Sequence, residues 1–427
     1  MSDALNWDAA TIDNSLLEKV NPVFQTAKMT LFQLAANGDP DAAALAKAMG
    51  LTREATQDSV NTTASPEQVL GGTITLEARY RTMQNLAESS GFTLVDLPCG
   101  YTPRGISFAK KGLPYYGLDL PVVVREISGQ AGAMIPAEQR ELVRYRAVDA
   151  TNYASLEQAV GDVEGEVCIT TEGLLMYFTD SEAAALCDNV RRILQEKGGC
   201  WYVADMEASL QYIITMRALV GDRFAEIMQN AKQQTKDKSD VAIGKNSLIT
   251  SPADMEGSTR RAMGFLAEYG LRAERVVVAD HMPELDSLSR VSPEQARAIR
   301  EGMRHCAFWK ITPNESAPAV ELQSSETENF AITASIRDGV LSIALSGRLD
   351  TISAPNLLAF FEAAREEHPV EAVSIDCSDL LYVSSAGLRV LVMMRKSCRG
   401  GVTLSNPNEL VTEIIAQTGF GAVLTIA

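Results

Sequence analysis

Four acidic residues stand where four apolar runs of the sequence end. Asp96, Asp119, Asp149 and Glu172 close runs that have the length and composition of buried β-strands. No lysine accompanies these acids, so a phosphate group is a poor ligand for them. Carboxylates attract cations and accept hydrogen bonds from hydroxyl groups, and the set predicts a site for a cationic or hydroxyl-rich ligand. Taken singly, each acid is also compatible with a solvated turn.

The first acid belongs to a tight turn. The segment LVDLPCGYTPRGISFA leads from an expected strand to an expected helix through Asp96, Pro98, Gly100 and Pro103. A turn at the carboxyl end of the first strand is where open α/β sheets bind cofactors. The turn departs from the G-x-G-x-x-G pattern, which disfavours NAD and FAD. Asp119 comes 23 positions after Asp96, about where an acid accepts hydrogen bonds from ribose hydroxyls.

These residues need a sheet to bring them together. Seven apolar runs alternate with helical stretches, which predicts a mostly parallel, doubly wound α/β sheet. The runs are Thr93–Leu97, Tyr115–Leu118, Val143–Val148, Val167–Thr171, Trp201–Ala204, Arg275–Ala279 and Cys306–Ile311. We expect a helical cap at 1–90 and the sheet domain at 91–311, with a helical lid insertion at about 205–259.

Composition excludes several functional classes. The chain has 427 residues and a formal net charge of −17, which argues against an extended nucleic-acid surface. The N-terminus has no signal-peptide pattern, and no apolar stretch approaches the roughly 18 residues of a membrane span. The seven cysteines are scattered without CxxC pairs. We therefore expect a cytoplasmic protein with reduced core cysteines, no membrane partner and no nucleic-acid partner.

Residues 312–328 are rich in Glu, Ser and Pro and predict a flexible acidic linker. A separate module is expected at 329–427, beginning with two alternating strands around an Asp338-Gly339 turn. Its sequence YVSSAGLRVLV places Ser384 or Ser385 at the start of a helix. A phosphate added there would lie at the positive end of the helix dipole and would add close to two negative charges to a contact surface.

Residues 70–311 resemble the leucine carboxyl methyltransferase-like group of S-adenosylmethionine (SAM)-dependent methyltransferases. DLPCGYTPR is similar to the glycine-rich turn of that family, GLDLP to its acidic second-strand motif and TTEGLLMYF to its E-G-L-L-x-Y motif. Two positions depart from the pattern, because Pro98 replaces a glycine and Thr102-Pro103-Arg104 replaces Asp-Thr-Arg. Since proline has no backbone N–H, the turn must position the cofactor through Cys99 and Gly100.

The resemblance implies SAM as the cofactor and assigns roles to individual residues. Asp96 and Gly100 would line the methionine and ribose part, Asp119 would hold the ribose, Asp149 the adenine edge and Glu172 the amino end of the methionine. The SAM carboxylate would bind an Arg in the preceding helix, either Arg79 or Arg81.

The C-terminal module resembles the sulfate-transporter and anti-sigma-factor-antagonist (STAS) domain. GRLDTISAPNL is similar to the G-x-L-D motif of that family, and YVSSAGLRVLV to its phosphoacceptor loop and helix. The resemblance implies that Ser385 is the phosphorylated serine, and that Ser384 stands where well-known members carry Asp. It also implies that Asp350 lies on a surface facing an anti-sigma or switch-type kinase partner. The alternative is that both serines only cap the helix.

Three functions fit this sequence. The first is a SAM-dependent O-methyltransferase acting on a small-molecule carboxylate, regulated through Ser385 of the STAS domain. An ionised carboxylate needs no general base, and none of the three histidines lies near the strand-end motifs. No metal-ligand spacing is present, so no metal site is expected. The second is a non-catalytic SAM-binding sensor that feeds the signalling module, and the third is a plain anti-sigma antagonist joined to a scaffold.

Overall fold

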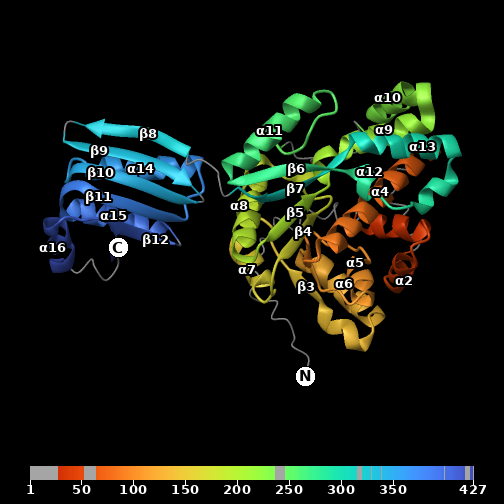
Figure 1. The fold of residues 1–427 in the computed structure, drawn as a ribbon, viewed down its shortest axis with the longest axis horizontal. Helices are drawn as coiled ribbons and strands as arrows, with labels where there is room; N and C mark the ends of the chain where they lie inside the picture. Colours follow the sequence, from red (N-terminus) through yellow and green to blue (C-terminus); the bar gives the residue numbers. More distant parts are fainter. Residues whose placement is uncertain are drawn as a thin grey trace. The chain divides into compact units, whose positions relative to one another are not determined.

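The chain folds as two compact units, Met1–Pro313 and Asn314–Ala427. The computed structural model describes residues 27–51, 64–235, 246–314, 320–327, 329–337, 339–398, 400–418 and 424–426. Each unit is built around one β-sheet with helices packed against it (Figure 1). In the first unit, further helices pack on the helices that cover one face of the sheet (Figure 1).

The sheet of the first unit has seven strands in the order β3-β2-β1-β4-β5-β7-β6. The strands are β1 Thr93–Asp96, β2 Tyr115–Asp119, β3 Val143–Ala147, β4 Val167–Thr171, β5 Gly199–Val203, β6 Leu271–Val277 and β7 Ala307–Pro313. β1 to β5 are parallel, whereas β7 is antiparallel to both of its neighbours. The chain winds outward from β1 to β3 and then returns to place β4 beside β1. This reversal creates the crevice in which open α/β sheets bind ligands.

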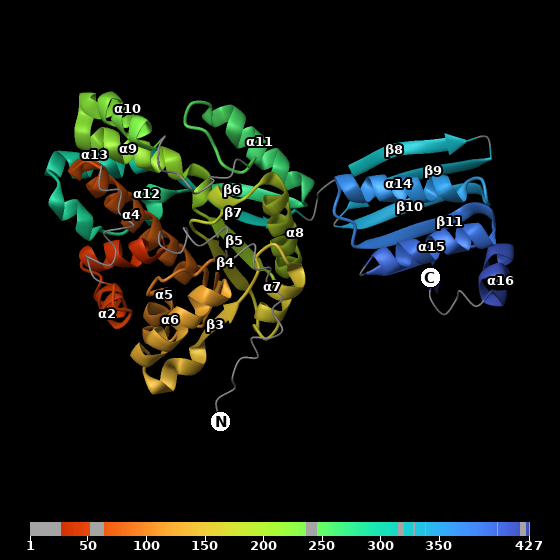
Figure 2. The same ribbon diagram turned by 180° about the vertical axis from the view of Figure 1, so that it is seen from behind.

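Helices cover both faces of this sheet (Figures 1 and 2). One face packs against α4 Pro66–Ser90, α5 Arg104–Lys110 and α6 Pro121–Met134. The other packs against α7 Tyr153–Val160, α8 Asp180–Lys197 and α11 Met255–Glu268. A capping box of Ser65 and Gln68 starts α4, which supplies Met83 and Leu86 to the same core as Leu94 of β1. α4 therefore belongs to the sheet domain although it lies in the expected cap region.

The stretch 205–259, expected to form a lid, divides between two places. Its first part forms α9 Ala208–Val220 and α10 Phe224–Thr235, and α9 packs on α4 and on α13 Pro293–Gly302. Its last residues begin α11, which covers the second face of the sheet instead. Ala262 and Leu266 of α11 are fully buried there, so apolar packing against the sheet decides the position of α11.

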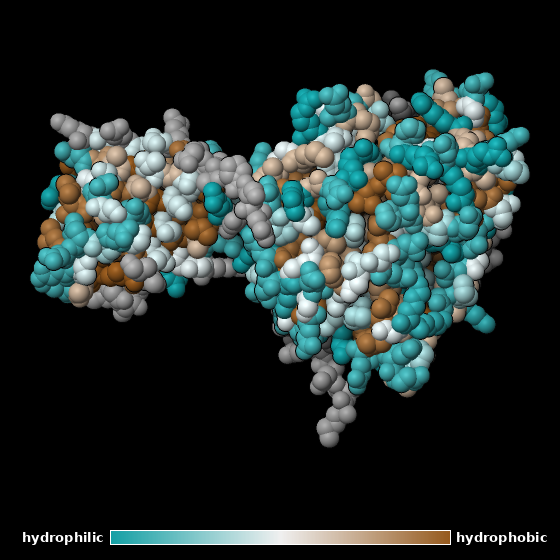
Figure 3. Space-filling model, in the orientation of Figure 1, coloured by the Kyte–Doolittle hydropathy of each residue, from teal (hydrophilic) through white to brown (hydrophobic). Residues whose placement is uncertain are grey.

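Short helices complete the first unit. They include α2 Pro40–Ala48, α12 Val278–His281 and the 3₁₀ helices Ala137–Leu142, Leu175–Tyr177, Asp205–Glu207, Gly221–Arg223, Asp286–Arg290 and Met303–His305. The surface shown in Figure 3 is mixed, with hydrophilic residues and separate hydrophobic patches. All seven cysteines of the chain are free and buried.

The second unit has a six-stranded sheet in the order β13-β12-β11-β10-β9-β8. Its strands are β8 Val320–Thr327, β9 Phe330–Arg337, β10 Val340–Leu349, β11 Ala372–Val383, β12 Gly401–Ser405 and β13 Thr425–Ile426. The helices are α14 Ala354–Glu367, α15 Ser385–Ser397 and α16 Glu409–Gln417. β8, β9 and β10 are antiparallel neighbours, and β10 to β13 are parallel.

β8 corrects the expectation of a flexible linker over 312–328. Val320–Thr327 pairs with β9 along most of its length, and Leu322 packs against the core of the second unit. Val320 and Leu322 alternate with Glu321 and Gln323, and the acidic, serine-rich composition concealed that period. Between β7 and β8 lie only residues 314–319.

Candidate functional site

The crevice at the reversal of strand order brings β1 and β4 together as parallel neighbours. Asp96 is the last residue of β1 and Glu172 directly follows β4, so both acids lie at the carboxyl end of the sheet. Asp119 ends β2, the strand on the other side of β1. The strand-end pattern of the sequence therefore places these three acids along one edge.

Asp96 is buried beneath this edge, with 1% of its surface exposed. Arg104 donates to both of its carboxylate oxygens at 2.9 and 3.0 Å. Thr170 Oγ1 donates to one oxygen at 2.8 Å and Tyr115 Oη to the other at 3.1 Å. Each oxygen thus already accepts two hydrogen bonds. This placement differs from the role expected for Asp96, because its acceptors are used within the protein.

Arg104 is the centre of a buried ionic cluster. Besides Asp96, it donates to Glu172 Oε1 at 2.5 Å and to the Tyr80 carbonyl oxygen at 3.3 Å. Its guanidinium lies 4.6 Å from the centre of the Tyr80 ring. Burial alone would lower the pKa of Arg104, but Asp96 and Glu172 raise it well above its ordinary value. Arg104 is therefore a permanent cation inside the protein.

Glu172 is partly exposed and has a second cationic neighbour. Arg79 Nε lies 3.4 Å from Glu172 Oε2, and the side chains are 19% and 11% exposed. Burial raises the pKa of Glu172, while Arg104 and Arg79 oppose that effect. The alternative Arg81 points elsewhere, since it pairs with Glu77 at 2.9 Å and Asp286 at 2.6 Å. The structure thus places Arg79, and not Arg81, beside Glu172.

Asp119 holds the turn after β1 in place. Its oxygens accept hydrogen bonds from Gly100 N at 2.8 Å and Leu120 N at 2.7 Å. Cys99 N also donates to the Leu118 carbonyl at 2.9 Å. Gly100 has φ of 54°, a left-handed conformation that favours glycine. Burial raises the pKa of Asp119 to about 7, although both amide hydrogen bonds act in the opposite direction.

Asp149 lies in the turn between β3 and α7. It accepts hydrogen bonds from the backbone N and the hydroxyl of Thr151, at 2.9 and 2.7 Å. Within the described part of the chain, no recorded contact joins Asp149 to the other three acids. Its observed interactions are those of a turn residue.

Two residues that the sequence did not single out hold the loop after Glu172. Asp205 accepts hydrogen bonds from three successive backbone amides, those of Gly173, Leu174 and Leu175, at 2.5, 2.8 and 2.9 Å. Asn246 Nδ2 donates to the carbonyls of Leu175 and Phe178 at 2.6 and 3.0 Å. Asp205 follows the run Trp201–Ala204, so the strand-end rule that identified the other acids also points to it.

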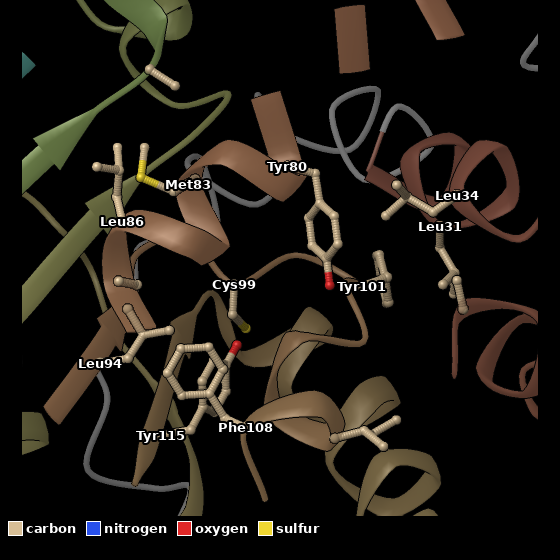
Figure 4. Packing of buried hydrophobic residues seen from close by; sticks show 14 of the residues in the cluster. Leu31, Leu34, Tyr80, Met83, Leu86, Leu94, Cys99, Tyr101, Phe108 and Tyr115 are labelled. Carbon is tan, nitrogen blue, oxygen red and sulfur yellow. The ribbon is translucent and has the colours of Figure 1, made fainter. Parts of the chain in front are cut away.

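A cavity of about 230 Å³ opens between α2, α4 and α5. Its lining includes Asp39, Tyr80, Arg81, Gln84, Ser107 and Lys111. Tyr80 also belongs to the packed cluster beneath the crevice, where it lies with Cys99 and Tyr101 from the turn after β1 (Figure 4). None of the acids that close β1, β2 and β4 lines this cavity.

The second unit brings its predicted residues to the start of α15. Ser384 is the N-cap, and its hydroxyl accepts a hydrogen bond from Gly387 N at 3.2 Å. Ser385 is the first residue of the helix and is exposed. Asp350 Oδ1 accepts hydrogen bonds from Ile352 N and Ser353 N, which closes the turn before α14. A Cβ on Gly387 would lie 2.7 Å from Leu349, so only glycine allows α15 to approach β10 this closely.

Comparison with known families decides the nature of this unit. The family model of the STAS domain matches residues 331–427. Residues 331–427 are a STAS domain. The sequence-based recognition of this domain is confirmed, as is the α/β fold class with a seven-stranded Rossmann-like sheet and a separate small α/β unit.

Solved structures similar to the STAS domain include two anti-sigma factor antagonists. The protein from Mycobacterium paratuberculosis is 23% identical, with a TM-score of 0.22, and the match covers 24% of this chain and 88% of that one. SpoIIAA in its unphosphorylated form is 19% identical, with a TM-score of 0.21 and coverage of 22% and 87%. No curated protein matches the chain.

The first unit also has a structural neighbour. Geranyl diphosphate methyltransferase, in complex with GPP and sinefungin, is 15% identical with a TM-score of 0.26. The match covers 52% of this chain and 69% of that one. Among the described residues, no group of three or more His, Cys, Asp and Glu could hold a metal ion. No helix in the same residues is long and apolar enough to cross a membrane.

Proposed function

We propose that the first unit is a SAM-dependent methyltransferase and that the STAS domain regulates it through a protein partner. One observation carries the proposal. At the crevice where strand order reverses, Glu172 follows β4 and Asp119 ends β2, the two strands that flank β1; Arg79 of α4 reaches Glu172, and Asp119 holds Gly100 in the turn after β1. The Arg79–Glu172 pair suits an amino acid and the Gly100–Asp119 pair suits ribose hydroxyls, which are the two ends of the methionine and ribose part of SAM.

The residues present fit this cofactor. Arg79 Nε faces Glu172 at 3.4 Å, and the terminal nitrogens of Arg79 make no hydrogen bond among the described residues, so its guanidinium has donors left for the SAM carboxylate. Asp119 accepts one amide on each oxygen and keeps lone pairs for ribose hydroxyls. Asp149 would bind the adenine edge, and Glu172 would face the amino end. When bound, SAM supplies an electrophilic methyl group on its sulfonium.

The acceptor that we propose is a small-molecule carboxylate. Its oxygen is already ionised at pH 7 and can attack the methyl group without a general base. The protein then has to align the two molecules and exclude water. The two histidines of this unit lie in α12 and the 3₁₀ helix Met303–His305, so neither follows β1, β2 or β4.

The proposed regulation acts through Ser385. The hydroxyl of Ser384 is used to cap α15, whereas that of Ser385 is exposed at the first position of the helix. A phosphate there would be favoured by the helix dipole and would add negative charge to the surface that also carries Asp350. The partner would be an anti-sigma factor or a switch-type kinase.

Calorimetry with SAM and S-adenosylhomocysteine tests the proposal first. We expect both to bind, and Arg79→Met and Asp119→Asn to weaken them, while Asp162→Asn at the exposed Arg146 pair changes nothing. Transfer of a labelled methyl group into a metabolite extract then tests catalysis. Binding without transfer to any acceptor would establish the sensor function instead, and absence of binding to the folded protein would overturn both.

A further inference from the structure

The ionic cluster under the crevice has balanced charges. Two carboxylates, Asp96 and Glu172, alternate with two guanidinium groups, Arg104 and Arg79. Arg104 bridges the two acids, with one nitrogen on Asp96 and the other on Glu172. The acid that the proposed cofactor would meet is therefore already neutralised from inside the protein.

Arg104 is fixed in this position. It is 1% exposed, and its bonds to Asp96, the Tyr80 carbonyl and Glu172 hold it from three sides. Movement away from Glu172 would leave a buried guanidinium with fewer partners, which is unfavourable. An arriving cation therefore does not displace Arg104.

An ammonium group gains little at such an acid. Its attraction to Glu172 is offset by repulsion from Arg104 at one oxygen and Arg79 at the other. A ligand carboxylate meets the opposite situation, because Arg79 is partly exposed and only its Nε approaches an acid among the described residues, Glu172 Oε2 at 3.4 Å, which leaves both terminal nitrogens without a hydrogen bond there. Arg79 can thus offer a charge-assisted, two-nitrogen contact to a carboxylate.

We propose that Arg104 is a specificity-determining residue which makes this site select its ligand by the carboxylate and not by the amino group. The inference rests on the proposed function, since it concerns the amino-acid end of an adenosyl ligand. The ligand class is an adenosyl thioether or sulfonium with a terminal carboxylate, with or without an α-amino group. Arg104 acts by neutralising Glu172, which would otherwise attract the ammonium group of the ligand.

Three ligands test this inference by calorimetry at pH 8. They are S-adenosylhomocysteine, its analogue without the amino group and its analogue without the carboxylate. We expect deamination to weaken binding less than about threefold and decarboxylation to weaken it roughly 10- to 100-fold. If removal of the amino group weakens binding as much as removal of the carboxylate, or more, the inference is overturned. The proposed function would still stand, because the ligands bind. Absence of binding by all three would instead overturn the proposed function.

A double variant tests the role of Arg104 directly. Arg104→Met with Asp96→Asn removes the internal cation and its buried partner together, so no unpaired charge remains. We expect deamination to become costly in this variant, about tenfold or more. A cost unchanged from that of the wild type would refute the role of Arg104.

The matched control is Arg191→Met with Asp188→Asn, which removes another buried pair, on α8, with an N–O distance of 2.6 Å. It should keep the wild-type ligand preference. If the Arg104 variant does not fold, the wild-type ligand series still decides whether the site selects its ligand by the carboxylate and not by the amino group.

Discussion

Replacing Asp119 with Asn should remove much of the pH dependence of the stability of the first unit. Burial raises the pKa of Asp119 from 3.8 to about 7 in the folded protein. Between these values the folded protein keeps a proton that the unfolded chain has released. The stabilisation from this group is therefore complete below pH 3.8 and is lost as the pH rises through about 7.

The size of the effect follows from the displacement of the pKa. Roughly three pKa units at about 1.4 kcal/mol each give about 4 kcal/mol between pH 4 and pH 8. Asn resembles the protonated acid, because it is uncharged and has one acceptor oxygen. Relative to the wild type, Asp119→Asn should gain up to about 4 kcal/mol of stability between pH 4 and pH 8, because only the wild type loses the favourable proton over this range.

Urea unfolding at several pH values, followed by tryptophan fluorescence, measures this difference. Trp201 and Trp309 are buried in the first unit, and the STAS domain contains no tryptophan. The control is Asp162→Asn, because Arg146 lowers the pKa of Asp162 and it does not titrate in this range. Parallel curves of stability against pH for the wild type and Asp119→Asn would refute the reasoning.

Four further substitutions have defined outcomes. Asp205→Asn should lower the free energy of unfolding by about 2 kcal/mol, because one of its oxygens no longer accepts a backbone amide, and hydrogen exchange should locate the loosened loop. Ser384→Ala should lower the free energy of unfolding of the STAS domain by about 1 kcal/mol, because α15 loses its N-cap, but it should not prevent phosphorylation. Ser385→Ala should abolish the incorporation of phosphate by a switch-type kinase, as measured by mass spectrometry. Gly387→Ala should destabilise the STAS domain by about 1–3 kcal/mol in thermal unfolding, since its Cβ would meet Leu349; an unchanged midpoint would contradict that packing.

Local patterns were sufficient to predict the sheet of the first unit. Each of the seven apolar runs overlaps one of the strands β1 to β7, because strands that lie in a sheet covered by helices are short and rich in apolar residues. The same patterns failed for β8, whose Glu and Ser content resembled a linker. They also failed for α11, because its amphipathic period does not tell which surface it covers. Strand pairing and helix docking at these places are decided by contacts distant in sequence.

The sequence predicted where the acidic residues of the site lie better than it predicted what each of them does. The rule that acids end strands located Asp96, Asp119 and Glu172 at one edge, and the same rule applied to β5 would have included Asp205. The rule could not show that Asp96 faces inward, because Asp96 meets its partner Arg104 only when the helix after β1 packs against the sheet. A ligand contact and a buried ion pair look alike in a single sequence.

Because all seven cysteines are buried and free, the reaction of their thiols can report unfolding. Five of them, at positions 99, 168, 187, 200 and 306, belong to the first unit, and two, at 377 and 398, to the STAS domain. A thiol reagent added to the native chain should react only when a unit opens. The number of labels on each molecule would then reveal which unit had opened, and ligand or phosphate effects on either could be followed without an added probe.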